Sequence, residues 1–238
     1  MTVQTGGAGF DQLIGTEGPD NLDGAGGDDQ ILGRGRGDDL RGGEGNDEIF
    51  GEGGNDVLRG GKGADDLSGG IGNDTLYALG DINRDIAGNL LAPEDEQEVG
   101  ADTLTGGSGQ DLFYIQESGT GESGAVDAGF GFETNQQYAF IEDFTAGEDK
   151  IRLPGSPSNY ATSYYDSNDD GTSDSTAIVY TEDPNVSFSI GLGPISIGGT
   201  RTLEIPDGIV LVALVEGNTD EVQGLSSSST YVYGAGTV

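Results

Sequence analysis

The sequence predicts an all-β fold in which short strands stack along a repeating chain, followed by a C-terminal β-rich region. Three observations support this prediction. A nine-residue pattern recurs in phase from Gly6 to Tyr77. Half of the 46 glycines lie in that stretch, where they favour tight turns over helix. Most aromatic residues follow residue 97, so only the later part of the chain can form a conventional hydrophobic core.

The repeat runs through eight copies without a break. Each copy has Gly at position 1, Asp at position 6 and Leu or Ile at position 8. Position 4 is Gly in every copy except the fourth, where it is Arg36. A disordered linker of similar composition would have no reason to keep Asp and Leu or Ile in phase over eight periods. The stretch therefore predicts a repeat architecture.

Each fixed position of the repeat has a physical role. The residue at position 8 lies in a predicted three-residue strand, whose neighbours at positions 7 and 9 point the other way. One apolar side chain per strand cannot bury itself, so the strands must stack into a continuous ladder of Leu and Ile. The glycines permit a partly left-handed turn in which backbone carbonyl groups converge. With the Asp carboxylate, these oxygens form the ligand set that Ca²⁺ prefers.

Composition and charge exclude several classes of function. The chain has 238 residues and a formal net charge of −34, which disfavours nucleic acid as a partner and favours cations. It has no Cys and no His, so disulfides, thiolate sites, His-ligated zinc and Ser-His-Asp catalysis are excluded. No apolar run has the length of a transmembrane segment. We therefore expect a calcium-binding protein that is not an enzyme.

Repeats such as GGEGNDEIF (42–50), GGKGADDLS (60–68) and GGIGNDTLY (69–77) resemble the nonapeptide of the RTX family of hemolysin-type calcium-binding proteins. The resemblance implies a right-handed parallel β-roll, in which two nonapeptides make one 18-residue turn. It also implies that each ion is held by the position-6 carboxylates of repeats n and n+2 and by loop carbonyl groups. The implied carboxylates are those of Asp11, Asp20, Asp29, Asp38, Asp47, Asp56, Asp65 and Asp74.

The repeat phase is lost after Tyr77 and then returns. Residues 78–96 are expected to leave the roll as an excursion, because Asp85 would fall at the apolar position 8. The phase resumes as QEVGADTLT (97–105) and GGSGQDLFY (106–114). The first predicted domain therefore comprises residues 1–114.

Continuation of the roll extends the implied ligand set. Asp102 and Asp111 take position 6, which brings the expected number of calcium ions to about six to eight. The implied carbonyl ligands belong to positions 2 and 4 of four repeats. They are the carbonyl groups of Gly43, Gly45, Gly61, Gly63, Gly70, Gly72, Gly107 and Gly109.

The second predicted domain, residues 115–238, is expected to be a β-rich cap that closes the open end of the roll. Stacked strands need such an end, because a bare sheet edge is a template for aggregation. Within it, IVLVALVEG (209–217) predicts a strand buried on both faces. STYVY (229–233) predicts the final strand.

The stretch FIEDFTAGEDKIRL (140–153) resembles the segment that follows the roll in serralysin-type RTX modules. In that family the matching acids hold a further calcium ion, which here implies Asp143 and Asp149. The alternative is that both are surface acids beside a buried Phe144 and Ile151.

A last motif, YYDSNDDGTSDSTAIVY (164–180), places Asp166, Asn168 and Asp170 as in the first half of an EF-hand loop. The twelfth position is Ala177, so the bidentate Glu of that loop is missing. The alternative is a long hairpin turn rich in turn-forming residues. The sequence leaves both interpretations open.

The expected function follows from these features and from the resemblance. RTX proteins carry an uncleaved C-terminal signal for the type I secretion machinery, and no Sec-type signal peptide is visible in the first residues. We expect a secreted monomer that folds on binding calcium and acts at the cell surface or in the extracellular matrix, with a cell-surface polysaccharide as its partner. The alternative is the calcium-binding and secretion module of a larger secreted enzyme, such as an epimerase or a lipase, or of a toxin.

Overall fold

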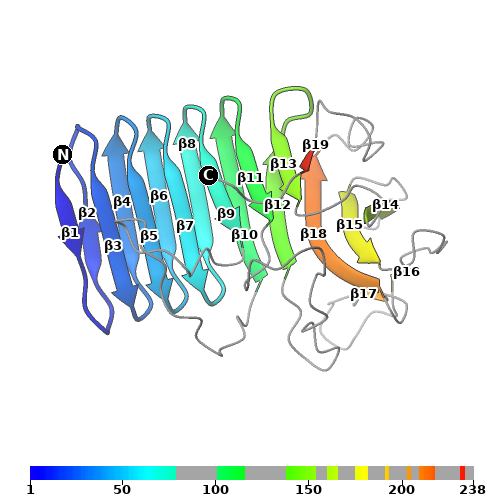
Figure 1. The fold of residues 1–238 in the computed structure, drawn as a ribbon, viewed down its shortest axis with the longest axis horizontal. Coiled ribbons are helices and arrows are strands. Elements are labelled where there is room, and N and C mark those ends of the chain that lie inside the picture. Colours follow the sequence, from blue (N-terminus) through cyan, green and yellow to red (C-terminus); the bar gives the residue numbers. More distant parts are fainter. Residues whose placement is uncertain are drawn as a thin grey trace.

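The computed structural model describes an all-β molecule. The described residues are 1–78, 101–115, 138–153, 160–165, 175–181, 191–192, 203–204, 209–217 and 231–233. Within these ranges there is no helix, and so none that could cross a bilayer. Two long sheets run along the molecule and enclose one hydrophobic core (Figure 1).

The strands divide between the two sheets in a regular way. In the repeat region they are β1 (Val3–Thr5), β2 (Gln12–Ile14), β3 (Asn21–Gly26), β4 (Gln30–Gly35), β5 (Asp39–Glu44), β6 (Glu48–Gly53), β7 (Val57–Lys62), β8 (Asp66–Ile71), β9 (Thr75–Ala78), β10 (Ala101–Ser108) and β11 (Leu112–Ile115). The later strands are β12 (Tyr138–Phe144), β13 (Lys150–Leu153), β14 (Tyr160–Tyr165), β15 (Ser175–Thr181), β16 (Gly191–Leu192), β17 (Leu203–Glu204), β18 (Ile209–Gly217) and β19 (Tyr231–Tyr233). Sheet 1 has the order β1-β3-β5-β7-β9-β11-β13-β19, and sheet 2 has the order β14-β15-β18-β12-β10-β8-β6-β4-β2.

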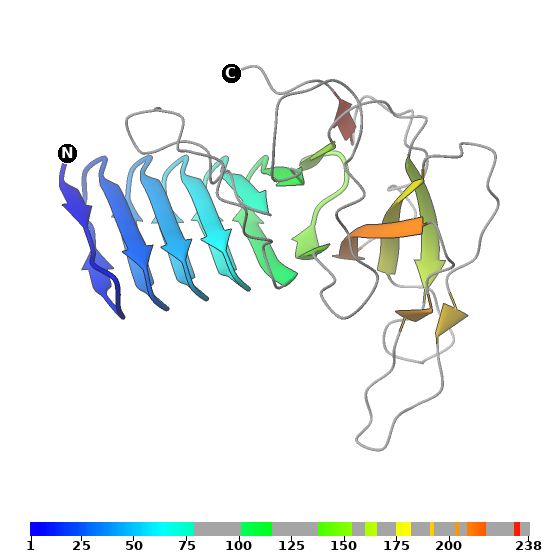
Figure 2. The same ribbon diagram turned by 60° about the horizontal axis from the view of Figure 1, so that its bottom comes forward.

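Consecutive strands of the repeat region therefore lie in opposite sheets, and each strand pairs in parallel with the strand two places later. Leu22 of β3 is in register with Leu40 of β5, which is in register with Leu58 of β7. This offset confirms the predicted parallel β-roll with two nonapeptides per turn. Figure 2 shows the turns stacked in file from the N-terminus.

The strands of the roll are longer than predicted. The sequence predicts three-residue strands, whereas β3 to β8 each contain six residues. The pairing continues past positions 7–9 into positions 2 and 3 of the next repeat, as Ala25 pairs with Gly43 and Gly26 with Glu44. The pairing includes position 2 although its backbone has positive φ, for example +75° at Ala25 and +116° at Gly43, so only positions 4–6 remain for the loop.

The position-8 side chains form the core of the roll, as predicted. They are fully buried from Leu22 to Leu76. The same cluster continues through Phe113 and Ile151 in sheet 1 and through Leu104 and Ile141 in sheet 2.

The roll resumes after the interruption, as predicted. Leu76 pairs with Phe113, and Leu67 pairs with Leu104. Ala78, which the sequence places in the excursion, instead ends β9 and is buried, because it pairs with Ile115. The remainder of the expected excursion lies outside the described residues.

Both sheets continue into the C-terminal part of the chain. The predicted strand at 209–217 is present as β18, between the parallel β12 and the antiparallel β15, with Ala213 and Val215 buried. The predicted final strand is present as β19, which pairs with β13. The antiparallel pair β14 and β15 flanks residues 166–174 as the hairpin interpretation requires, but that loop lies outside the described residues.

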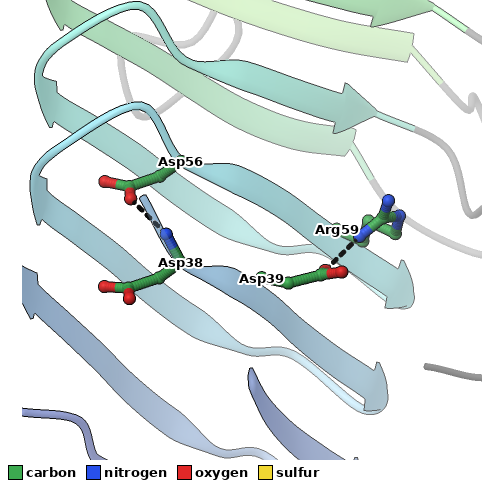
Figure 3. A network of polar contacts seen from close by, with 4 residues as sticks. All are labelled: Asp38, Asp39, Asp56 and Arg59. Carbon is green, nitrogen blue, oxygen red and sulfur yellow. Dashed lines mark hydrogen bonds and ion pairs between the residues drawn. The ribbon is translucent and has the colours of Figure 1, made fainter. Parts of the chain in front are cut away.

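The outer face of sheet 1 carries a column of position-9 side chains. Arg59 forms an ion pair with Asp39 (Figure 3) and lies 5.0 Å from the ring centroid of Tyr77. Tyr77 stacks on Tyr114 at 4.5 Å, and the hydroxyl group of Tyr114 accepts a hydrogen bond of 2.7 Å from Arg152. These contacts tie five neighbouring turns together on the solvent side.

Candidate metal centre

The position-6 aspartates form two files along the roll, one in each row of loops. From Asp20 to Asp111 they are almost fully buried, with exposed fractions of 0–3%. In each file the carboxylate of one turn accepts a hydrogen bond from the backbone of the turn before. The Oδ1 atom of Asp56, for example, accepts the N–H group of Asp38 at 2.8 Å (Figure 3).

This contact recurs at every predicted pair. The N···Oδ1 distances lie between 2.7 and 3.0 Å. The pairs are Asp11/Asp29, Asp20/Asp38, Asp29/Asp47, Asp38/Asp56, Asp47/Asp65, Asp56/Asp74, Asp65/Asp102 and Asp74/Asp111. The structure therefore brings together the residues that the RTX resemblance pairs.

The second carboxylate oxygen behaves differently from the first. In seven aspartates the Oδ2 atom is buried and has no hydrogen-bond partner. They are Asp29, Asp38, Asp47, Asp56, Asp65, Asp74 and Asp111. A buried carboxylate oxygen without a partner is costly, so these atoms mark places where a cation would be stabilising.

The invariant glycine at position 1 makes room for this oxygen. Position 1 faces inward and is buried, next to the carboxylate of its own repeat. A Cβ atom on Gly33 would lie 2.6 Å from Oδ2 of Asp38 and 3.1 Å from the carbonyl oxygen of Gly51 in the next turn. A side chain at position 1 would therefore fill the space that the carboxylate and the carbonyl group share.

Burial changes the protonation of these carboxylates. Burial is the largest cause in each case, and it raises the pKa of Asp38 and of Asp47 to about 6. It raises the pKa of Asp74 to about 7 and that of Asp65 to about 8, where the neighbouring carboxylate of Asp102 adds to the effect. The pKa values of further members of the two files are also raised, for the same reason. They are Asp29, Asp56 and Asp111.

The glycines predicted to supply carbonyl ligands lie at positions 2 and 4. All eight have positive φ, for example +116° at Gly43 and +124° at Gly45. In four of them the carbonyl group lies against the same position of the next turn. They are Gly43, Gly45, Gly70 and Gly72. The carbonyl oxygen of position 1 lies next to the same space, as that of Gly51 does beside Gly33, and this residue was not among the predicted ligands. The carbonyl ligands at positions 2 and 4 stay a prediction.

Side chains alone do not form a metal site in this part of the chain. Among the described residues, no three His, Cys, Asp or Glu side chains gather closely enough to hold an ion. An ion bound here would need backbone carbonyl oxygens beside the carboxylates. This requirement agrees with the ligand types expected of Ca²⁺. The carboxylate of Asp38 and the carbonyl group of Gly51 both lie next to Gly33.

The two aspartates of the 140–153 segment lie at the end of the roll. Asp149 extends one file, because its Oδ1 atom accepts the N–H group of Asp111 at 2.9 Å. FTAGEDKIR (144–152) is thus a further nonapeptide, in which Phe144 replaces the glycine of position 1. Asp143 accepts the N–H groups of Gly106 and Gly107 at 2.8 and 2.7 Å. Neither is a free surface acid.

Position 5 also has a structural role, which was not predicted from the sequence. The side-chain oxygen of Asn55 accepts the N–H group of Asn73 at 3.0 Å, and the side-chain oxygen of Asn73 accepts that of Gln110 at 2.9 Å. The recurrence of Asn before Asp in three of the repeats was the available signal. The remaining candidates, Asp166, Asn168 and Asp170, lie outside the described residues.

In this parallel β-roll the loops bury carboxylates that each keep one oxygen without a hydrogen-bond partner, which is an arrangement that a hard cation would stabilise. Residues 5–40, 32–67, 41–76, 59–81 and 98–114 match the family model of the RTX calcium-binding nonapeptide repeat, which contains four copies. These segments are RTX repeats, and the resemblance seen in the sequence is confirmed for them. The matched segments do not include 140–153, so the serralysin-like resemblance stays a prediction. A comparison with curated proteins gave no match.

Proposed function

We propose that this protein is a secreted calcium-binding repeat protein whose roll folds when several calcium ions bind outside the cell. The observation that carries the proposal is the set of seven buried carboxylate oxygens that have no partner. Burying ionised carboxylates side by side is strongly unfavourable unless a cation compensates them. RTX repeats bind calcium, and calcium is the cation that suits this set of oxygens.

The residues that would hold the ions are the position-6 aspartates with loop carbonyl groups. At a free calcium concentration of ten times Kd, one site stabilises the folded state by about 1.4 kcal/mol, and six independent sites by about 8 kcal/mol. This is comparable to the whole stability of a typical domain. Calcium binding of this size is sufficient to decide whether the roll folds.

The dependence on calcium supports an extracellular location. Extracellular calcium modules have Kd values of about 10⁻⁴–10⁻³ M, so sites of this kind stay empty in the cytosol and fill outside the cell. The chain would then pass through the type I secretion machinery unfolded and fold on arrival. Secretion by this route is typical of proteins with RTX repeats.

We propose a structural role at the cell surface or in the extracellular matrix, with a cell-surface polysaccharide as the partner. The RTX repeat is a structural, calcium-binding repeat and not a catalytic one. The position-6 carboxylates are engaged in contacts between turns, which supports a structural use of these acids.

Far-ultraviolet circular dichroism of the purified chain tests the proposal. In excess chelator at neutral pH we expect a coil-like spectrum, and in millimolar calcium a β spectrum. Magnesium should not substitute, because it requires short octahedral coordination and retains its water ligands. A β spectrum of equal strength in chelator would overturn calcium-coupled folding.

A further inference from the structure

The position-6 aspartates fall into two groups according to the partner of their Oδ2 atom. In three of them this atom accepts a hydrogen bond from position 2 of the same repeat. The distances are 2.5 Å from the nitrogen of Gly7 to Asp11 and 2.7 Å from that of Thr145 to Asp149. Asp20 is bonded in the same way, by both the nitrogen and the hydroxyl group of Thr16. Those two distances are 2.5 and 2.8 Å.

The backbone at position 2 separates the two groups. In all seven repeats with an unpartnered Oδ2 atom, position 2 has positive φ, from +68° at Glu52 to +119° at Gly61. Three of the residues that adopt this conformation there are not glycine: Ala25, Arg34 and Glu52. None of the three position-2 residues that donate to Oδ2 has positive φ.

A physical reason connects the two observations. The angle φ is the rotation about the N–Cα bond, so it sets the direction of the N–H group relative to the chain that follows. With the ordinary negative φ at Thr16, the loop returns so that the carboxylate of Asp20 meets that N–H group. With positive φ, as at Glu52, no N–H group meets the Oδ2 atom of Asp56. Threonine strongly disfavours positive φ, because its side chain is branched at Cβ.

We propose that the backbone conformation at position 2 decides which position-6 aspartates bind an ion. Those with left-handed position 2 are metal ligands, and the hydrogen-bonded Asp11, Asp20 and Asp149 close the ends of the files without an ion. This inference rests on the proposed function and narrows the sequence prediction, which counted all three as ligands. Asp102 is not assigned, because its repeat begins outside the described residues.

The location of the hydrogen-bonded aspartates fits a capping role. Asp11 and Asp20 belong to the first two repeats, and Asp149 to the last turn that pairs with β11. An ion at an end of the roll would have protein ligands on one side only. Repeat arrays commonly end in capping units that differ from the internal ones and need no further neighbour. Here, backbone N–H groups and the hydroxyl group of Thr16 donate to the terminal Oδ2 atoms in place of an ion.

Position 52 offers a matched pair of variants that test the inference. Glu52 is exposed, so its replacement removes no core packing, and Glu52→Thr and Glu52→Gly remove the same charge. Bound calcium is counted by native mass spectrometry of the full chain. We expect Glu52→Gly to keep the wild-type number of ions and Glu52→Thr to hold one ion fewer, since Thr turns the loop toward the hydrogen-bonded form.

The reverse change provides a gain of binding. Thr16→Gly removes the hydroxyl donor and permits positive φ, so we expect one ion more than in the wild type. Equal ion counts in the wild type, Glu52→Thr and Thr16→Gly would overturn the inference. If Glu52→Thr does not fold in calcium, the number of ions bound by Thr16→Gly alone tests the inference. Absence of calcium from the wild type would instead refute the proposed function.

Discussion

Shortening one side chain of the internal ladder measures how far the roll depends on it. Ile49 of β6 is fully buried and lies in register between Ile31 and Leu67. Ile49→Ala removes three carbon atoms, which is worth about 2.4 kcal/mol in transfer free energy alone. The cavity that remains adds to this, so we expect a loss of about 3 kcal/mol in the free energy of unfolding. For a chain of this size, this lowers the Tm by about 6–12 °C.

The structure offers a matched control on the neighbouring strand. Ile71 of β8 is 72% exposed, so Ile71→Ala removes the same atoms from solvent-exposed surface. Its free energy of unfolding should change by less than about 0.5 kcal/mol. Both variants are melted in saturating calcium and followed by circular dichroism at a β-sheet wavelength. Equal shifts in Tm for the two variants would refute the account of the core.

Three further predictions concern the loops. In chelator, the free energy of unfolding should rise as the pH falls from about 8 towards 4. The reason is that burial raises the pKa of Asp65 to about 8, so the folded state takes up a proton that the unfolded state does not. A β signal independent of pH in that range would contradict this. Asp47→Ala, in the middle of a file, should reduce calcium stoichiometry in calorimetry more than Asp11→Ala at its end, and equal losses would contradict the pairing. Gly33→Ala should cost about 1–3 kcal/mol in urea unfolding, whereas Gly9→Ala, with open space around it, should be neutral; equal effects would show that position 1 has room for a side chain.

The repeat phase made most of the roll predictable. Asp at position 6 and Leu or Ile at position 8 fix which side chains face inward, so the burial of Leu40 and Ile49 follows from the repeat phase. The proximity of Asp38 to Asp56 follows from the 18-residue turn that the RTX resemblance implies. Strand length did not follow, because the glycine-rich start of each repeat predicts a turn, whereas positions 2 and 3 pair with the next turn of the roll. Pairing with the next turn decides whether these positions join the strand, and the sequence of a single repeat does not show that pairing.

Two features of the site lay beyond the sequence for identifiable reasons. The last nonapeptide was hidden because Phe144 replaces the expected glycine and because its turn is separated from Asp111 by 38 residues instead of 18. The division of the position-6 aspartates into those with and those without a hydrogen-bond partner at Oδ2 could not be predicted, because it depends on φ at position 2. Ala25 and Glu52 adopt left-handed backbone there, although neither residue type predicts it.

The central claim is that the unpartnered oxygens of the two files are calcium ligands. Anomalous diffraction from crystals grown with calcium tests it most directly, because it locates each ion. The account predicts peaks about 2.3–2.6 Å from Oδ2 of Asp38, Asp47 and Asp56. It predicts no peak at Oδ2 of Asp20, which Thr16 already occupies. A folded roll in saturating calcium without peaks at the first three atoms would contradict the account.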